Sequence, residues 1–482
     1  MEKQQIQVAT AQRDIKWADG FRGLAALLVV SSHLTLTFFP AALPPSSSKS
    51  ALPSWYQLPY LRLLFTEGFP WVAVFFLLTG FVNALGPIKK ARSSRPETAL
   101  ASLSSSTFRR VFRLVLPCTI MTVVSWAICQ FDGYEMGRIS SSEWIRNTSP
   151  MKSANFLAAV RALAKWIFKT WAHGENTYDK NQWTMIWFLK GSMMLFLILL
   201  ALVRATPSWR VGVLAGLYIW AFIKKDSMIG LPIYAGALLA EASLHPRIVA
   251  FAASRTVASR IIPVALLLLG GFLTSYPYKN ADWSPWSHFL KDLATNLFPK
   301  GASPRNFWCA IGVQLIALSI LLSASFQRIL SHPILVWLGG ISFPIYLIHG
   351  PLLRSCFQWF LFAGIAPQKF SEKNDKGEMK EWERLPAAEG WKLAIGLPLF
   401  FAVLLLLAHV WTVKVEAWCA RVTKWAEERM VGKTSQADEK REQSPLLLPL
   451  SNPGSVAGSS GRPSDEIGAV QVYEYRDARS LV

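Results

Sequence analysis

Long apolar runs recur along this 482-residue chain, and they restrict the folds that are open to it. A helix that crosses a bilayer needs about 20 consecutive apolar residues, because lipid offers the backbone no hydrogen-bond partner. The pattern therefore predicts an all-α protein, a polytopic membrane bundle of about ten transmembrane helices. The fifth and sixth runs are short, so they could instead form one re-entrant hairpin. The expected spans are residues 20–40, 69–86, 111–130, 183–203, 211–224, 228–242, 260–275, 307–326, 334–353 and 392–413.

The positive charge of the chain, formally +20, predicts how these spans are oriented. The linker 87–110 is basic and rich in serine, so the positive-inside rule places it in the cytosol, together with both termini. The loop 131–182 then lies on the opposite side. It is itself basic, but it carries a glycosylation sequon at Asn147, which supports that placement. No basic stripe with interleaved aromatic residues lies outside the apolar runs, so we expect membrane lipid, and not nucleic acid, as a partner.

Composition divides the chain into three parts. We expect a cytosolic N-terminal segment at 1–15, a membrane domain at 16–425 and a disordered cytosolic tail at 430–482, because the tail is rich in Ser, Pro and Gly. The five cysteines are odd in number and form no CxxC pair, which argues against a disulfide framework. The seven histidines form no i, i+4 pair, so the sequence predicts no metal site.

The first span carries titratable residues near both of its ends, in the sequence DGFRGLAALLVVSSHL. At about 100° per residue, the step from Arg22 to His33 returns to nearly the same helix face, about 16 Å further along the axis. Asp19 precedes Arg22 by one helical turn, so these two side chains can pair. A snorkelling arginine and a hydrogen-bonded core histidine would be a purely structural explanation. Ionisable groups are costly inside a bilayer, however, so the arrangement favours a functional site.

Other stretches carry polar or small residues in a helical pattern. Ser342, Tyr346 and His349 share one helix face in the sequence SFPIYLIHGPLL, where they could line a hydrogen-bonded site or simply join helices. In GFPWVAVFFLLTGFV, Gly68 and Gly80 predict close helix approach. The sequence FRRVFRLVLP is basic, which indicates either membrane anchoring or recognition of the phosphates of a nucleotide-like donor. Its arginines are Arg109, Arg110 and Arg113.

These stretches resemble the motifs of the acyltransferase 3 family of integral-membrane O-acyltransferases. The resemblance covers about residues 15–415, and residues 298–312 further resemble the fungal branch of the family. The similar stretches are, in family order, residues 19–26 with His33, 75–81, 109–117 and 337–349.

The resemblance implies a reaction and a set of roles. Family members transfer an acyl group, usually acetyl, from acyl-CoA to a hydroxyl, with no permanently bound cofactor. His33 would be the general base or acyl relay, since imidazole titrates near neutral pH, and Arg22 would help to hold the donor. The fungal branch implies a hydroxylated small-molecule acceptor in secondary metabolism, and we expect an endomembrane location. The other residues expected at the donor or acceptor are Asp19, Arg109, Arg110, Arg113, Trp183, Ser342, Tyr346 and His349.

One stretch departs from the family pattern. Residues 181–196 resemble a family segment that carries a glutamate, yet Phe188 stands at the expected place. Either this chain has lost activity or changed its acceptor, or another acid such as Glu175 serves. Three alternatives therefore stay open: acylation of a surface polysaccharide, a catalytically impaired homologue with a binding role, and a transporter that uses buried His and Arg side chains as a proton relay.

Overall fold

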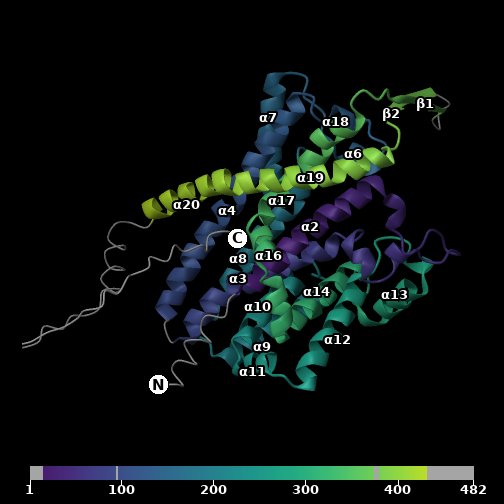
Figure 1. The fold of residues 1–482 in the computed structure, drawn as a ribbon. Coiled ribbons are helices and arrows are strands. Elements are labelled where there is room, and N and C mark those ends of the chain that lie inside the picture. Colours follow the sequence, from purple (N-terminus) through teal and green to yellow (C-terminus); the bar gives the residue numbers. More distant parts are fainter. Residues whose placement is uncertain (1–14, 94–95, 374–378, 431–482) are drawn as a thin grey trace, which may run out of the picture.

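The fold is almost entirely helical (Figure 1), which confirms the predicted all-α class. The computed structural model describes residues 15–93, 96–373 and 379–430. The predicted N-terminal segment and the predicted disordered tail fall almost wholly in residues 1–14 and 431–482, outside the described residues.

Seven helices of the described residues are long and apolar enough to cross a membrane. An eighth is present if α16 (Pro333–Gly340) and the segment Ser342–Phe362, which meet at 64°, form one broken span. That segment comprises α17 (Ser342–Arg354) and α18 (Cys356–Phe362). The seven are α2 (Lys16–Phe38), α3 (Phe69–Arg92), Glu97–Gln130 in α4 (Pro96–Gln130), Lys180–Ala201 with α8 (Met185–Ala201), α12 (Val257–Thr274), α14 (Pro304–Leu322), and Gly390–Met430 with α19 (Gly390–Trp411) and α20 (Ala417–Met430).

The predicted number of ten transmembrane helices was therefore too high. The difference lies in the fifth and sixth apolar runs, which form α9 (Pro207–Ile223) and α10 (Gly230–Ser243). These helices have 17 and 14 residues. At a rise of about 1.5 Å per residue, neither matches a hydrocarbon layer about 30 Å thick. Helix α10 is instead largely buried inside the protein, against α3.

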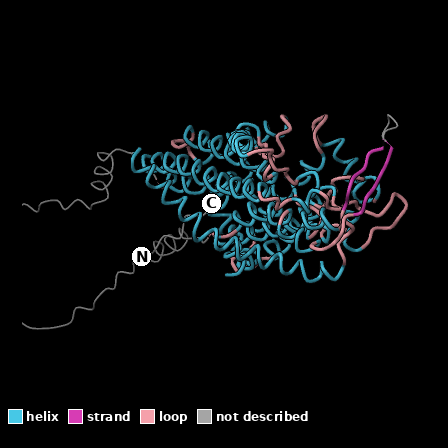
Figure 2. The backbone as a smooth tube through the Cα atoms, turned by 90° about the horizontal axis from the view of Figure 1, so that it is seen from above, coloured by secondary structure: helices cyan, strands magenta, loops and turns pink. Residues whose placement is uncertain are grey.

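Shorter elements connect the long helices. A hairpin of two antiparallel strands, β1 (Gln368–Lys373) and β2 (Met379–Arg384), lies at one end of the molecule (Figure 2), and Gln368 pairs with Arg384 in its register. The other helices are α5 (Glu135–Arg138), α6 (Glu143–Thr148), α7 (Phe156–His173), α11 (Pro246–Ala253), α13 (Pro285–Leu297) and α15 (Ala324–Leu330). Turns of 3₁₀ helix occupy Pro40–Ala42, Trp55–Gln57, Leu61–Leu64, Lys180–Thr184 and Ala281–Trp283, and a π-helix occupies Thr412–Glu416.

Glycines allow the central helices to touch backbone to backbone. A Cβ atom at Gly80 of α3 would overlap the carbonyl oxygen of Ile233 in α10, which confirms the close approach predicted for this glycine. A Cβ at Gly339 of α16 would likewise overlap the backbone of Asp19 in α2, and one at Gly23 would overlap the backbone of Gly339. The contact between α2 and α16 fixes the position of the charged residues at the start of α2.

Candidate active site

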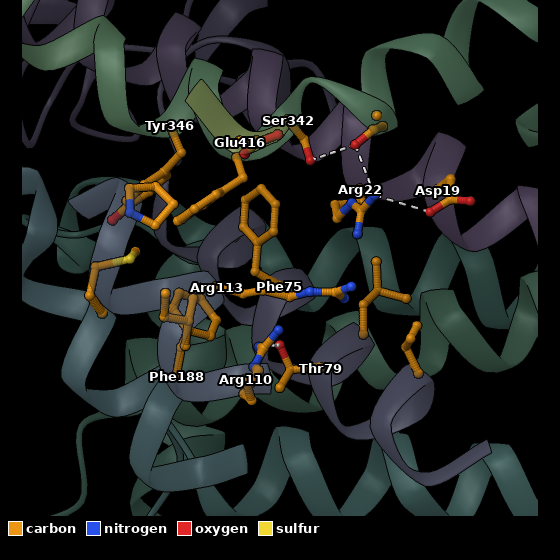
Figure 3. A pocket seen from close by; sticks show the side chains of 18 of the residues that line it. Asp19, Arg22, Phe75, Thr79, Arg110, Arg113, Phe188, Ser342, Tyr346 and Glu416 are labelled. Atoms are coloured by element: carbon orange, nitrogen blue, oxygen red, sulfur yellow. Dashed lines mark hydrogen bonds and ion pairs between the residues drawn. The ribbon is translucent and has the colours of Figure 1, made fainter. Parts of the chain in front are cut away.

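A cavity of about 110 Å³ lies where the first and last long helices meet the middle of the bundle (Figure 3). Its lining comes from α2, α3, α4, α8, α16, α17, the π-helix and α20, so it joins segments from both ends of the chain. The polar residues of the lining are Asp19, Arg22, Thr79, Arg110, Arg113, Ser342, Tyr346 and Glu416. The larger apolar residues are Phe75, Leu78, Val82, Leu114, Pro117, Met185, Phe188 and Phe343.

Arg22 is held in the cavity wall by the end of a neighbouring helix. Its Nη2 donates to the carbonyl oxygen of Gly339 at 2.9 Å and pairs with Asp19 at 3.1 Å, which confirms the predicted Asp19–Arg22 pair. The Gly339 carbonyl is one of the groups that the end of α16 leaves without a helical partner. Arg22 Nε is buried and has no hydrogen-bond partner among the described residues, so one donor remains unused.

Helix α4 adds two more arginines to the lining. Arg110 is buried, and its Nε donates to Ser192 Oγ at 3.1 Å. Arg113, one turn later, is partly buried and also lines the cavity. Arg109 does not line it, because its side chain is half exposed and pairs with Glu427 at 2.6 Å. The cavity thus collects three of the basic side chains named from the sequence and leaves Arg109 outside.

Aromatic rings form the wall opposite Arg22 in the view of Figure 3. Phe188 stacks on Phe76 with ring centroids 4.1 Å apart and an interplanar angle of 17°. Phe75 meets Tyr346 edge to face at 6.2 Å. The phenylalanine that departs from the family pattern is therefore part of the cavity wall and is fixed by packing.

A chain of hydrogen bonds leads from this wall deeper into the protein. The Tyr346 hydroxyl donates to the backbone oxygen of Asn181 at 2.7 Å, and the Thr184 hydroxyl lies 2.8 Å from it. One turn later, His349 Nδ1 lies 3.0 Å from the Ile345 carbonyl oxygen, and Nε2 lies 3.0 Å from the Asn181 amide nitrogen. A carbonyl can only accept, so Nδ1 carries the proton and Nε2 accepts from Asn181. Helix α17 thus unites the predicted face, although His349 does not line the cavity.

His33 lies at the far end of this chain. Its ring centroid is 5.2 Å from that of His349 and 4.8 Å from the Trp144 ring of α6. The side chain is partly exposed but does not line the cavity. Nδ1 is buried, and no hydrogen-bond partner for it is found in residues 15–93, 96–373 and 379–430. A buried ring nitrogen without a partner is unusual and is free to take up a proton from a substrate.

A buried ion pair holds the segment that carries Asn181. Arg354, at the end of α17, lies 3.2 Å from the Asp179 carboxylate, and both side chains are almost wholly buried. The same Asp179 oxygen accepts from the backbone N–H of Asn181 at 3.3 Å. Burial raises the pKa of Asp179 to about 6, and the neighbouring Arg354 guanidinium opposes that rise. Arg354 therefore keeps this carboxylate charged and Asn181 in place.

Other residues named from the sequence lie away from the cavity. Trp183 is more than a third exposed, and Asn147 is exposed on the short helix α6. Glu175, considered as the substitute acid, is exposed in a loop and pairs with Lys169 at 2.8 Å. The carboxylate that does enter the cavity from a later segment is Glu416, which the sequence reading missed. Its signal was an acidic residue in the apolar stretch that follows residue 392, since such residues seldom occur in membrane spans without a function.

Comparisons with known proteins agree with this arrangement. Residues 15–415 match the family described as "Acyltransferase domain", the acyltransferase 3 family. The chain is 26% identical over 372 residues to O-acetyltransferase PaAT-1 of Phomopsis amygdali, which covers 70% of this chain and 72% of that protein. It is 23% identical to acyltransferase R4 of a Phoma species and 24% identical to acyltransferase clz18 of Cochliobolus lunatus. Each of these matches covers 71% of this chain and 84% of the relative.

No solved structure matches the chain. The family match spans most of its length, and the similar proteins are named as acyltransferases. This chain therefore belongs to the acyltransferase 3 family and is a membrane acyltransferase.

Proposed function

We propose that the chain is an O-acetyltransferase that moves an acetyl group from acetyl-CoA to a hydroxyl of a small molecule in fungal secondary metabolism. The observation that carries the proposal is the arginine-lined cavity, joined through Tyr346 and Asn181 to the histidine pair. The name of the relative from Phomopsis amygdali, an O-acetyltransferase, supports the acetyl group and the hydroxyl acceptor.

The arginines suit an anionic donor. Guanidinium groups bind phosphate oxygens through paired N–H donors, and a water-poor pocket strengthens such bonds. Arg22, Arg110 and Arg113 bring three positive charges to one cavity, against two carboxylates in its lining. The phosphates of coenzyme A would bind these arginines, and the apolar wall would receive the acyl group. The arginines then hold and orient the donor and take no part in proton transfer.

His33 suits the role of base. In the proposed step its free Nδ1 takes the proton of the acceptor hydroxyl while the hydroxyl oxygen attacks the thioester carbonyl. The carbon–sulfur bond breaks, the coenzyme A thiolate leaves, and it ends as the thiol after taking up a proton. His33 keeps part of its surface exposed without lining the cavity, which supports separate approaches for acceptor and donor.

The orientation in the membrane follows from the same proposal. The donor is made in the cytosol, so the arginine side of the cavity faces the cytosol, as do both termini. The loop with Asn147 faces the lumen of an endomembrane compartment, where the exposed asparagine can be glycosylated. Glycosidase treatment of the expressed chain, compared with Asn147→Gln, tests this orientation.

Metabolite profiling of a producing host tests the function as a whole. The wild-type chain is compared with an empty vector, with membrane levels of the protein measured. We expect one compound to gain an acetyl group when the chain is present, and its free hydroxyl form to decrease. Purified chain should then release coenzyme A from acetyl-CoA in the presence of that compound. If no acylated product forms at a matched protein level, a binding role is the better explanation.

Arg113→Gln is expected to weaken donor binding. Loss of one charge-assisted hydrogen bond to a phosphate costs about 1.5–3 kcal/mol, which corresponds to about a 10- to 100-fold rise in the KM for acetyl-CoA. The value of kcat should change much less, because the arginine contacts neither reacting atom. Arg109→Gln, one turn earlier on α4 and outside the cavity, is the control. Equal KM values for the two variants would remove Arg113 from the donor site.

Phe188→Ala is expected to change which acyl group is used. The ring stacks on Phe76 and closes the apolar wall, so its removal makes room for further methylene groups. Selection in an apolar pocket amounts to about 10- to 200-fold per methylene, so the ratio of butyryl to acetyl transfer should rise by about tenfold or more. Leu197→Ala, an exposed position on α8, should leave that ratio unchanged. The ratio is measured with the two acyl-CoA donors in competition.

A further inference from the structure

Glu416 brings a carboxylate into the cavity from the last long helix. It is the final residue of the π-helix Thr412–Glu416, which joins α19 to α20. A π-turn inserts an extra residue into a helix and redirects the side chains beside it, and such turns are frequent at functional sites. Figure 3 shows Glu416 in the same pocket as Ser342, Tyr346 and the arginines.

The carboxylate is buried but incompletely satisfied. Glu416 is 7% exposed, and its Oε2 has no hydrogen-bond partner in the part of the chain that the structure describes. Arg22 and Arg113 act on it electrostatically, which explains how a charge is tolerated there. They do not explain the unused oxygen, because a buried carboxylate without hydrogen bonds is costly.

The two unused atoms of the cavity are complementary in kind. Arg22 Nε is a donor without an acceptor, and Glu416 Oε2 is an acceptor without a donor. A ligand that satisfies both must carry an anionic or carbonyl oxygen and also an N–H or O–H group. A simple polyphosphate has no such donor when ionised, and the carboxylate would repel it. The pantetheine arm of coenzyme A has amide N–H groups between its phosphates and its sulfur.

We propose that Glu416 is a donor-binding residue that accepts a hydrogen bond from an amide N–H of the pantetheine arm, while the arginines hold the phosphates. The inference rests on the proposed function, because it assumes that acyl-CoA enters this cavity. It adds a selection rule: Glu416 favours thioester donors with an amide-bearing arm and disfavours polyphosphates of similar charge. No proton is transferred to or from Glu416 in this role.

The test measures two ligands on the full chain purified in detergent. Dissociation constants for coenzyme A and for inorganic pyrophosphate are compared in wild type and Glu416→Gln. Glutamine keeps the size of the side chain but loses the charge and accepts a weaker hydrogen bond. We expect binding of coenzyme A to weaken by about tenfold, since hydrogen bonds to charged groups are the stronger ones. Pyrophosphate should bind more tightly, because the repelling charge is gone.

Two controls keep this result interpretable. Glu428→Gln removes a carboxylate from the same helix, at an exposed position paired with Lys424, and should change neither constant. Glu416→Asp keeps the charge but shortens its reach, so coenzyme A should weaken while pyrophosphate stays as in wild type. This second variant also covers the case in which Glu416→Gln folds poorly, as judged by its melting temperature.

The outcomes separate the inference from the function beneath it. If Glu416→Gln tightens both ligands, the carboxylate is a counter-charge only, and the proposed hydrogen bond does not exist. If it changes neither ligand, Glu416 does not contact the donor. In both cases the wild-type chain still binds coenzyme A, and the proposed function stands. If the wild-type chain neither binds coenzyme A nor turns over acetyl-CoA, the proposed function itself fails.

Discussion

Replacing His33 by alanine is expected to lower the rate of acyl transfer by about 10²- to 10⁴-fold, the range that general base catalysis supplies. The expectation rests on the free Nδ1 of this side chain and on its place beside His349. The alanine variant keeps the donor cavity, because His33 does not line it. The KM for acetyl-CoA should therefore stay close to the wild-type value while kcat falls. Initial rates of coenzyme A release, measured with saturating acceptor, give both numbers.

His409→Ala is a suitable control for this experiment. His409 is also a histidine of a membrane-spanning helix, but it is exposed and lies 6.3 Å from Trp337, outside the cavity. Its replacement should leave kcat unchanged. A His33→Ala enzyme with wild-type kcat would show that the proton goes elsewhere, and His349 would then be the next residue to replace.

Arg354→Met is expected to lower the free energy of unfolding by about 3–5 kcal/mol, because it leaves the buried Asp179 carboxylate without its ionic partner. Without the guanidinium, burial alone acts on Asp179, and its pKa rises above the present value of about 6. A protonated Asp179 accepts the Asn181 N–H less well, so the bond from Asn181 to His349 should loosen and activity should fall as well. Unfolding midpoints in detergent measure the first effect.

The double variant Arg354→Met with Asp179→Asn separates charge from packing. It removes both charges, so it should recover a large part of the stability lost in Arg354→Met. Arg204→Met breaks an exposed pair with Glu97, which is worth about 0–1 kcal/mol, and should hardly move the midpoint. An Arg354→Met midpoint as close to wild type as that of Arg204→Met would show that water reaches Asp179 and replaces the arginine.

The features that sequence reasoning predicted are those set by local geometry. The pairing of Asp19 with Arg22 needs only the spacing of one helical turn, and the common face of Ser342 and Tyr346 needs only the helical period. The all-α class followed from the apolar runs, whose length excludes other membrane folds apart from barrels. The assignment of α9 as a span failed because apolar composition does not distinguish a helix that crosses lipid from a shorter one packed into the bundle.

The rest of the site depends on contacts between distant segments. Asn181 meets His349 across 168 positions of sequence, and nothing in the spacing of either predicts the other. Arg109 and Arg113 sit one turn apart on α4, yet only Arg113 faces the cavity, because Glu427 of α20 takes the Arg109 side chain. Glu416 reaches the cavity through a π-turn, which shifts the register away from the regular period that sequence reasoning assumes.

The cavity takes lining from α2 at the beginning of the described chain and from Glu416 near its end. Membrane helices enter the bilayer in order as the ribosome makes them, so the first wall is in place long before the last. A chain that stops after α18 would hold Arg22, Arg113 and His33 without the carboxylate that faces them. Completion of the donor pocket therefore marks completion of translation, and truncated products left in the membrane would be unable to consume the cell's acyl donor.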